Sequence, residues 1–538
     1  MHGHAGIASK SWRVARWAAL AAAAPALWAC TSRTLETPNM VPTATIQTNF
    51  TQKVANELDL LFMVDNSLSM KEMQQKLYDQ LPLFIQVLQQ LKNPPSLHLA
   101  VVSSDMGAPG DSTVALSCNH GQSGDFQSMA QGTCLGTTLT PGATFITNAD
   151  GMPNFTDGNI ADVFQCIALL GDGGCGFENQ LASIDAALGA QGLQPGQTPN
   201  PPSTNVGFLR PEAYLGIVIL TNEDDCSAPS NTTIYSQNGY QQNIADPDGP
   251  LTNYRCNGGP RGAHYCQDPA NGNAWTIPPL FPPPDAQGTA AAPTLDLAGC
   301  IDNEQSPMGT GTSALTPVSQ FISDIKSLKP DPDNQILVAA IAAPAAPYTV
   351  EWLPESQGTG TKPGELWPSV MHSCGTKGGP DVSPTAQSAT DSSFGDPGVR
   401  ISRFVSAFPN YVLASICDAS YASSMAEIAK RLGQLITPPC ITGTIENDGN
   451  GQPECSVVEH LTDMQQNKKD RVVQSCAETN NAAPCWTLAP PPVDPTNPTT
   501  CAGQQLTITD EAGIATNLES STINCALCLP GSTEPGCP

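Results

Sequence analysis

Residues 58–70 decide the fold and read LDLLFMVDNSLSM. With one exception, the residues of Leu58–Val64 are apolar, the composition of a strand buried on both faces of a parallel sheet. A polar turn follows and contains Asp65, Ser67 and Ser69. Beyond the turn, apolar residues recur at steps of three and four, which is the spacing of one helix face. The stretch therefore predicts a strand, a polar turn and a helix.

The same alternation continues along the chain and predicts an α/β fold. Further short apolar runs typical of buried strands are Leu97–Ser103, Tyr214–Leu220, Ile336–Ala342 and Tyr411–Ile416. Segments with helical spacing are Met70–Leu91, Phe177–Leu188, Val318–Leu328, Val399–Phe408 and Tyr421–Leu435. Strands alternating with helices favour a doubly wound, mostly parallel sheet with helices on both faces.

Three long segments interrupt this rhythm, at residues 105–165, 226–315 and 344–395. They are rich in Gly, Pro, Asn, Ser and Cys, and loops of this length are uncommon unless they are functional or disordered. Their cysteines predict long insertions pinned by disulfides. After Pro438 the helical spacing fades while cysteines remain frequent, so residues 438–538 are predicted to form a small, Cys-rich β domain.

The amino terminus has the features of an export signal. Basic residues precede an apolar segment, residues 17–29, that is too short to cross a bilayer as a helix. The segment ends at Cys30 and resembles a bacterial lipoprotein signal, in which this cysteine is acylated and becomes the new amino terminus. An ordinary secretory leader with an unrelated cysteine is the alternative. Residues 1–30 are thus a predicted signal peptide, and the polar residues 31–54 a predicted tether.

Net charge and cysteine content indicate which binding partners the protein can have and in which cellular compartment it folds. The chain carries 49 acidic and 22 basic residues, a net charge of -27, so we expect no binding to nucleic acid and membrane contact only through the lipid anchor. Apart from Cys30, 18 of the 19 cysteines remain, an even number that could close nine disulfides in an oxidising compartment. Cys525 and Cys528 could instead form half of a zinc site or a redox pair, but no second pair at zinc-finger spacing and no neighbouring His accompanies them.

One acidic stretch, residues 446–451, resembles the start of a calcium-binding loop because oxygen-bearing side chains alternate ahead of a Gly. The twelfth position of such a loop would be Val457, where a bidentate Glu is needed. The dipeptide Asp448-Gly449 suits the backbone angles of a hairpin turn. We therefore predict a turn here.

The turn after the first strand carries the clearest chemistry. Ligands of open parallel sheets bind beyond the carboxyl ends of the strands, where Asp65, Ser67 and Ser69 lie. One carboxylate and two hydroxyls are hard oxygen ligands that suit Mg²⁺ and supply a single negative charge, so a bound ion stays attractive to an acidic partner. The alternative is that these residues only cap the helix that follows, since Asp and Ser are favoured caps.

The run Leu60–Met70 resembles the start of a von Willebrand factor type A (vWFA) domain, whose metal-ion-dependent adhesion site opens with Asp-x-Ser-x-Ser. The resemblance covers residues 55–437 and is closest to the vWFA domains of Cys-rich bacterial lipoproteins. It implies a Rossmann-like sheet in which the apolar runs are the first, second, fourth, fifth and sixth strands, whereas the third is not evident. The chain after Cys440 resembles the domain often appended in that group.

The resemblance also implies a metal site, with two departures from the family pattern. The pattern has a Thr in the loop before the third helix, where this chain offers only Asp172, and an Asp after the fourth strand, where it has Asn222. An amide oxygen adds no charge, so affinity falls unless a nearby acid such as Glu223 or Asp224 reaches the ion. The implied ligands of a weak Mg²⁺ or Ca²⁺ site are Asp65, Ser67, Ser69, Asp172, Asn222 and Asp224. The alternative is a vestigial site whose acids cap helices.

The sequence predicts a binding protein and no enzyme. We find no Gly-x-Ser-x-Gly turn, no His-Glu-x-x-His pair and no phosphate-binding Gly-rich loop. The predicted function is an exported, lipid-anchored binding or adhesion module of the bacterial cell envelope, at the outer membrane or cell surface. It would recognise a protein or peptide carboxylate through its cation. The alternatives are a structural envelope lipoprotein with a vestigial metal site, and a hydrolase or redox activity in the insertions or the terminal domain.

Overall fold

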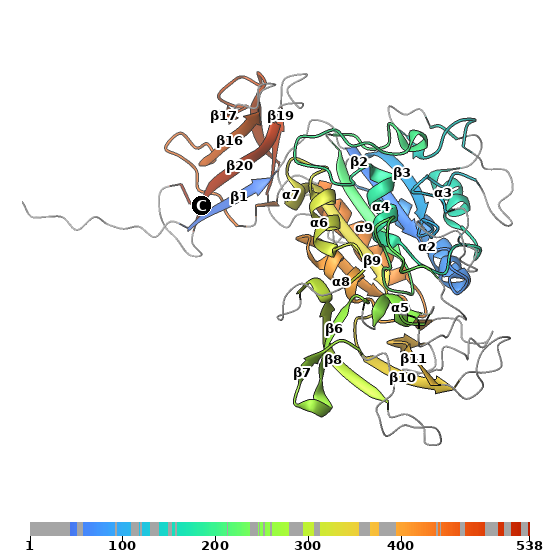
Figure 1. Cartoon of the computed structure of the whole chain (residues 1–538). Coiled ribbons are helices and arrows are strands. Elements are labelled where there is room, and N and C mark those ends of the chain that lie inside the picture. Colours follow the sequence, from blue (N-terminus) through green and yellow to red (C-terminus); the bar gives the residue numbers. More distant parts are fainter. Residues whose placement is uncertain are drawn as a thin grey trace, which may run out of the picture.

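The fold is seen in a computed structural model of the whole chain (Figure 1). It describes residues 44–50, 57–91, 94–108, 118, 121–129, 139–148, 153–155, 159–211, 213–236, 246, 248–250, 253–258, 261–278, 294–305, 313–354, 366–375, 394–436, 440–441, 443–462, 468–489, 504–509, 518–528 and 536–537. The predicted signal peptide and its Cys30 lie outside these residues.

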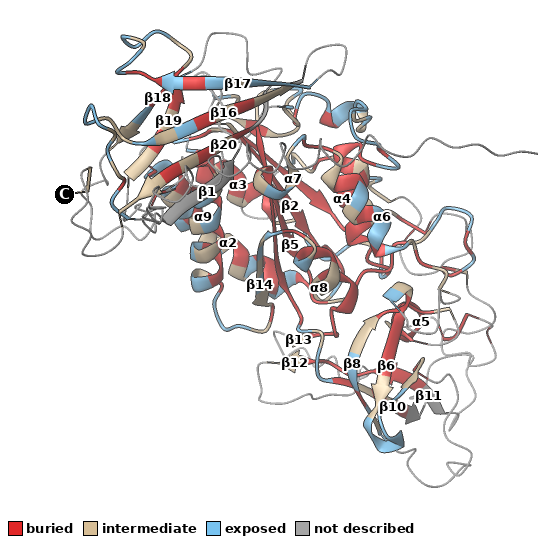
Figure 2. Ribbon diagram, turned by 90° about the vertical axis from the view of Figure 1, so that its left-hand side faces the viewer, coloured by how far each residue is buried: buried red, intermediate tan, exposed pale blue. Residues whose placement is uncertain are grey.

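A six-stranded sheet forms the centre of the molecule. Its strand order is β14-β9-β5-β2-β3-β4, and every neighbouring pair is parallel except β3 and β4. The strands are β2 (Glu57–Val64), β3 (Ser96–Ser103), β4 (Ile146–Thr147), β5 (Tyr214–Leu220), β9 (Ile336–Ala342) and β14 (Asn410–Ser415). β2, β3, β5 and β9 are buried almost throughout, as Figure 2 shows.

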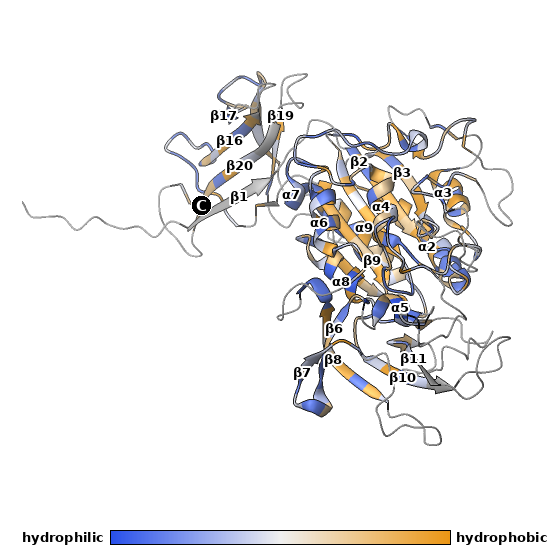
Figure 3. Cartoon of the chain, in the orientation of Figure 1, coloured by the Kyte–Doolittle hydropathy of each residue, from blue (hydrophilic) through white to orange (hydrophobic). Residues whose placement is uncertain are grey.

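Helices cover both faces of this sheet. Leu60 and Phe62 of β2 pack on one side with helices α2 (Lys71–Gln89), α3 (Ile160–Ala168) and α9 (Ala422–Ile436). Leu61 and Met63 point to the other side, against α4 (Gln180–Leu188), α6 (Val318–Lys326) and α8 (Val399–Ser406). Because successive side chains of a strand point to opposite faces, one apolar strand supplies two cores. Figure 3 shows the resulting apolar centre and the more polar outer surfaces of the helices.

The predicted α/β architecture with a mostly parallel sheet is confirmed. The five apolar runs are strands within one residue of their predicted ends. Two elements inside the first predicted insertion were not expected, the antiparallel strand β4 and helix α3. A short turn, α7 (Pro332–Gln335), also precedes β9.

The second and third predicted insertions combine into one further sheet. Its five strands are ordered β11-β10-β8-β6-β7 and come from both segments. The strands are β6 (His264–Asp268), β7 (Ala274–Thr276), β8 (Leu295–Asp302), β10 (Tyr348–Pro354) and β11 (Leu366–Val370), with helix α5 (Asn253–Asn257) beside them. A two-stranded ribbon, β12 (Cys374–Gly375) and β13 (Phe394–Gly395), follows.

Disulfides secure these insertions as the composition predicted. Within the described residues they join Cys118 to Cys175, Cys226 to Cys256, Cys266 to Cys300 and Cys374 to Cys417. Each closes a loop of at least 30 residues, so each removes freedom from the unfolded chain.

The chain after residue 438 is β-rich, also as predicted. Seven strands are ordered β1-β20-β16-β17-β18-β19-β15. They are β1 (Ala44–Phe50), β15 (Cys440–Ile441), β16 (Cys455–Thr462), β17 (Lys468–Ser475), β18 (Cys485–Ala489), β19 (Gln504–Thr509) and β20 (Leu518–Leu527). β1 belongs to the segment predicted as a tether, and that prediction is wrong for Ala44–Phe50 because this strand pairs antiparallel with β20.

Local details of this β region agree with two sequence predictions. Cys525 bonds to Cys455 and Cys528 bonds to Cys537, so these two cysteines form neither a zinc site nor a redox pair with each other. The Gly451 N–H donates to the Asp448 carbonyl, which closes the predicted hairpin turn. Among the helices in the described parts of the chain, none combines the length and apolar character needed to cross a membrane.

Candidate functional site

The candidate site lies at the carboxyl ends of β2 and β5, in the middle of the central sheet. After β2 the chain continues to β3 on one side, whereas β5 leads to β9 on the other. This is the point where the strand order reverses, and loops diverging there leave a crevice that serves as a binding site in open α/β sheets. Asp65 follows β2, and Thr221 and Asn222 follow β5.

Asp65 is fully buried and held by three donors. Its Oδ1 accepts hydrogen bonds from the Ser67 N–H at 2.8 Å and the Ser104 hydroxyl at 3.0 Å. Its Oδ2 accepts one from the Thr221 hydroxyl at 2.7 Å. Burial raises the pKa of Asp65, and these hydrogen bonds oppose the rise by stabilising the charged form. The carboxylate therefore has a fixed orientation between the two strand ends.

Ser69 and Asn222 meet across the crevice although they are 153 positions apart in the sequence. The Ser69 hydroxyl lies 3.0 Å from Asn222 Nδ2 and 3.2 Å from Oδ1. Ser67 is 3 % exposed, and its side chain lies beside Asp65, where it helps the Ser67 N–H to oppose the rise in the pKa of that carboxyl. A hydroxyl that donates its proton to a carboxylate keeps oxygen lone pairs, so Ser67 still has acceptor capacity for a ligand at this point.

Asp172 does not join the group around Asp65. Its side chain is exposed and makes no hydrogen bond or ion pair with any described residue. The neighbouring part of its loop does reach the site, because the Gly174 N–H donates to the Asn66 carbonyl at 2.9 Å. Gln74 of α2 donates to the Gly171 carbonyl and anchors the other end of the loop.

Asp224 is likewise engaged elsewhere, which corrects its predicted role. Its carboxylate accepts the N–H groups of Arg400 and Ile401 in the first turn of α8 and lies 2.7 Å from His264 Nε2. An acid at a helix N-terminus satisfies backbone donors that lack partners within the helix. Asp224 thus has the capping role that was the alternative to metal binding.

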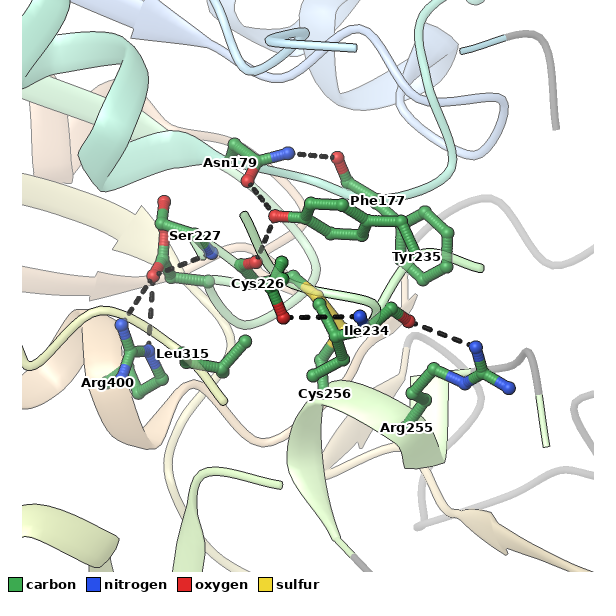
Figure 4. The surroundings of a disulfide bond; sticks show 12 residues. Phe177, Asn179, Cys226, Ser227, Ile234, Tyr235, Arg255, Cys256, Leu315 and Arg400 are labelled. Atoms are coloured by element: carbon green, nitrogen blue, oxygen red, sulfur yellow. Dashed lines mark hydrogen bonds and ion pairs between the residues drawn. A yellow bond between two sulfur atoms is a disulfide. The ribbon is translucent and has the colours of Figure 1, made fainter. Parts of the chain in front are cut away.

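The segment after Asp224 is also held in place by side-chain hydrogen bonds and a disulfide. Arg400 donates to the Asp225 carboxylate, and the Tyr235 hydroxyl lies 2.6 Å from Asn179 Oδ1 and 2.8 Å from the Cys226 carbonyl, beside the Cys226–Cys256 disulfide (Figure 4). The strand end that carries Asn222 is therefore rigid, and rigid positioning of ligands lowers the cost of binding an ion.

Two acidic residues outside the six implied ligands lie beside this group. Glu178 is 3 % exposed and contacts the side chain of Glu223, and the charge of Asp65 acts on both. Glu178 precedes α4 and Glu223 follows Asn222. The proximity of Glu223 to Asn222 was visible in the sequence, whereas no local pattern marked Glu178 as its neighbour.

The chemistry of the site is that of hard oxygen ligands. Ser67, Ser69 and Asn222 supply neutral oxygens. Asp65 lies beside them and supplies the negative charge of the site. Among the described residues, no three His, Cys, Asp or Glu side chains gather closely enough to hold a metal by themselves. A cation at this site therefore depends on hydroxyl and amide oxygens, which Mg²⁺ and Ca²⁺ accept.

Comparison with known proteins adds no family. The sequence matches no family model and no curated protein. Among solved structures, the pilus adhesin SpaC from Lactobacillus rhamnosus GG is 11 % identical, covering 90 % of this chain and 41 % of that chain at a TM-score of 0.26. The pilus adhesin RrgA from Streptococcus pneumoniae is 11 % identical, with 90 % and 58 % covered and a TM-score of 0.25. The chain thus spans about half the length of these adhesins, and at such TM-scores the likeness does not amount to a shared fold.

Proposed function

We propose that this protein is a vWFA-type binding module in which a divalent cation joins Ser67, Ser69 and Asn222 to a carboxylate of another protein. One observation carries the proposal: the Ser69–Asn222 contact, beside the buried hydroxyl of Ser67, gathers oxygens from two strand ends at the switch point of the sheet. Such oxygens are acceptors, and a shared cation is the ligand that satisfies them together.

The charge of the site favours an acidic partner. With Asp172 and Asp224 directed elsewhere, the ligands proposed here are neutral, and Asp65 is the acid at their centre. The ion would keep part of its positive charge for a carboxylate that completes its coordination. Leu68, which is 72 % exposed in the same turn, offers an apolar contact next to that carboxylate.

The proposal places the protein outside the cytoplasm, held by lipid at Cys30. The disulfides support an oxidising compartment, since such bonds rarely persist in the cytosol. In this arrangement the polar segment after Cys30 leads from the membrane to the folded domains. The same proposal treats the chain as a binding protein and not an enzyme.

Calorimetric titration of the exported protein with Mg²⁺ and Ca²⁺ tests the cation. We expect millimolar or tighter binding that weakens at least tenfold in Asp65→Asn and in Ser69→Ala. Asp79→Asn, an exposed aspartate of α2, is the matched control and should bind as the wild type does. Equal cation affinities of the wild type and Asp65→Asn would contradict the proposal.

The partner is tested with the same variants. Immobilised protein should retain envelope proteins in the presence of Mg²⁺, and both EDTA and Asp65→Asn should release them. Retention that persists in both conditions would instead favour the structural envelope role, in which the metal site is vestigial.

A further inference from the structure

A second group of oxygens, on the side of Glu178 and Glu223 that faces the insertions, encloses a small cavity. The cavity has a volume of about 10 Å³, about the space that one water or one ion occupies. Its lining includes Glu178, Glu223 and Asn253, together with the Cys226–Cys256 disulfide. It therefore lies between the end of β5 and helix α5 of the insertion.

The two glutamates contact each other in the interior, where a charged group is poorly solvated. Both carboxyls are buried, and Asp65 and Asp396 lie near enough for their charges to act on Glu223. Within the described residues, no Lys, Arg or His forms an ion pair with either glutamate. Two touching carboxyls cannot both stay charged without help, so they need either a proton on one of them or a cation between them.

Two neutral oxygens near the glutamates also lack hydrogen-bond partners and could bind a cation. Asn253 Oδ1 is buried without a hydrogen-bond partner, while its Nδ2 donates to Asp396 at 2.6 Å and so fixes the amide. Gln180 lies outside the lining of the cavity, where it is fully buried, its Nε2 donates to the Glu223 carbonyl at 3.2 Å, and its Oε1 also lacks a partner. Both unpartnered atoms are acceptors, and a shared proton on the glutamates would satisfy neither of them.

We propose that Glu178, Glu223 and Asn253 hold a buried Ca²⁺ in this cavity, separate from the cation at Ser67, Ser69 and Asn222. Two carboxylates neutralise the charge of the ion, and carboxylate and amide oxygens are its preferred ligands. Ca²⁺ suits the site better than Mg²⁺ because it accepts irregular coordination and sheds its water more readily.

The bound ion would connect two parts of the fold. Glu178 precedes α4, Glu223 follows β5, and Asn253 begins α5, so one ion would tie the central sheet to the insertion. The Cys226–Cys256 disulfide joins the same two segments covalently. The ion and the disulfide would thus both fix the segment that follows β5. This would keep Asn222 in place beside Ser69.

Native mass spectrometry of the full exported protein in Ca²⁺ counts the ions directly. We expect two Ca²⁺ in the wild type, one in the double variant Glu178→Gln/Glu223→Gln, and two in the control Glu427→Gln, a half-buried glutamate of α9 that lies outside both sites. Asp65→Asn should remove the other ion and leave this one. A double variant that retains the wild-type count overturns the inference, as does a wild type whose single ion is lost in Asp65→Asn and kept in the double variant.

Thermal unfolding keeps the test decisive if the double variant folds less well. Ca²⁺ should raise the melting temperature of the wild type and of Asp65→Asn by several degrees, because an ion bound only to the folded state stabilises it. The single variant Glu223→Gln, which leaves one carboxylate, should lose most of that shift. An unchanged shift in Glu223→Gln would contradict the inference, whatever the outcome for the Asp65 site.

Discussion

At the scale of residues, the candidate site depends on one close approach between loops. A Cβ added at Gly174 would lie 2.3 Å from Asn66 Oδ1 and 2.8 Å from the Asn66 carbonyl oxygen. Neither position leaves room for a methyl group, and the backbone atom cannot rotate away. Gly174 therefore lets its loop rest on the turn that carries Asp65 and Ser67.

We expect Gly174→Ala to displace this turn and to weaken cation binding several-fold. Gly173→Ala is the matched control, because a Cβ there meets nothing within 4 Å. Calorimetric titration of the two variants checks the prediction. Equal affinities would show that the loop does not support the turn.

The residue pattern predicted part of the site. The vWFA resemblance implied that Asp65 and Asn222 share one site, and the parallel pairing of β2 with β5 places both residues at the same edge of the sheet. The contact between Glu178 and Glu223 could not be predicted, because it depends on how far α4 is shifted relative to β5. Asp172 and Asp224 were implied as ligands by the vWFA resemblance, but side-chain direction is not visible in a loop sequence.

At the scale of elements, the packing of α4 on α6 includes a buried acid. Asp185 of α4 is 2 % exposed, and its Oδ1 has no hydrogen-bond partner. Burial, and then the charge of Asp324 on α6, raises the pKa of Asp185 to about 8. In the unfolded chain this carboxyl titrates at about 3.9.

The sign of the pH dependence follows. The folded protein keeps a proton that the unfolded chain releases, so the contribution of Asp185 to stability is complete below about pH 4 and is lost as pH rises towards about 8. Asp185→Asn should remove this loss and raise the free energy of unfolding by roughly 2 kcal/mol near neutral pH.

Thermal melts of this variant between acidic and neutral pH check the expectation. The melting temperatures of variant and wild type should converge in acid and separate near neutrality, while Asp79→Asn follows the wild type throughout. A constant difference at all pH values would mean that Asp185 does not titrate as its burial requires.

Elements with a strong periodic pattern were predictable and short ones were not. The buried strands have long apolar runs that no helix or loop would favour. β4 has only two residues, Ile146–Thr147, which is too short for any period. Helix α3 carries a complete capping box, in which Asn159 accepts from two backbone N–H groups and Asp162 accepts from the Asn159 N–H. That box was the signal available in the sequence for this helix.

At the scale of the molecule, a buried arginine joins the insertion sheet to the central domain. Arg400 of α8 is 1 % exposed and forms ion pairs at 2.9 Å with Asp225, after β5, and with Asp302, at the end of β8. Removing one member of such a group leaves the others charged and unpaired in the interior.

We expect Arg400→Met to lower the free energy of unfolding by about 3–5 kcal/mol, because Asp225 would lose its cation in the interior, whereas Asp302 would keep its ion pair with Arg403. Arg431→Met, an exposed residue of α9 paired with Glu427, should change it by less than about 1 kcal/mol. Urea unfolding measures both values. Similar small losses in the two variants would contradict this account of how the insertion is attached.

The joining of the two insertions was the least predictable feature of the molecule. β8 and β10 pair through residues about 50 positions apart, such as Leu297 with Tyr348. Register over that distance is set by tertiary packing and leaves no local pattern. The pairing of β1 with β20, near opposite ends of the chain, could not be predicted for the same reason.

The central claim is that a cation binds at the strand ends after β2 and β5. Crystals grown with Mn²⁺, which replaces Mg²⁺ and scatters anomalously, locate such an ion directly. The account predicts an anomalous peak within bonding distance of Ser67 Oγ, Ser69 Oγ and the Asn222 amide oxygen. A map at saturating Mn²⁺ with no peak between these three atoms would contradict it.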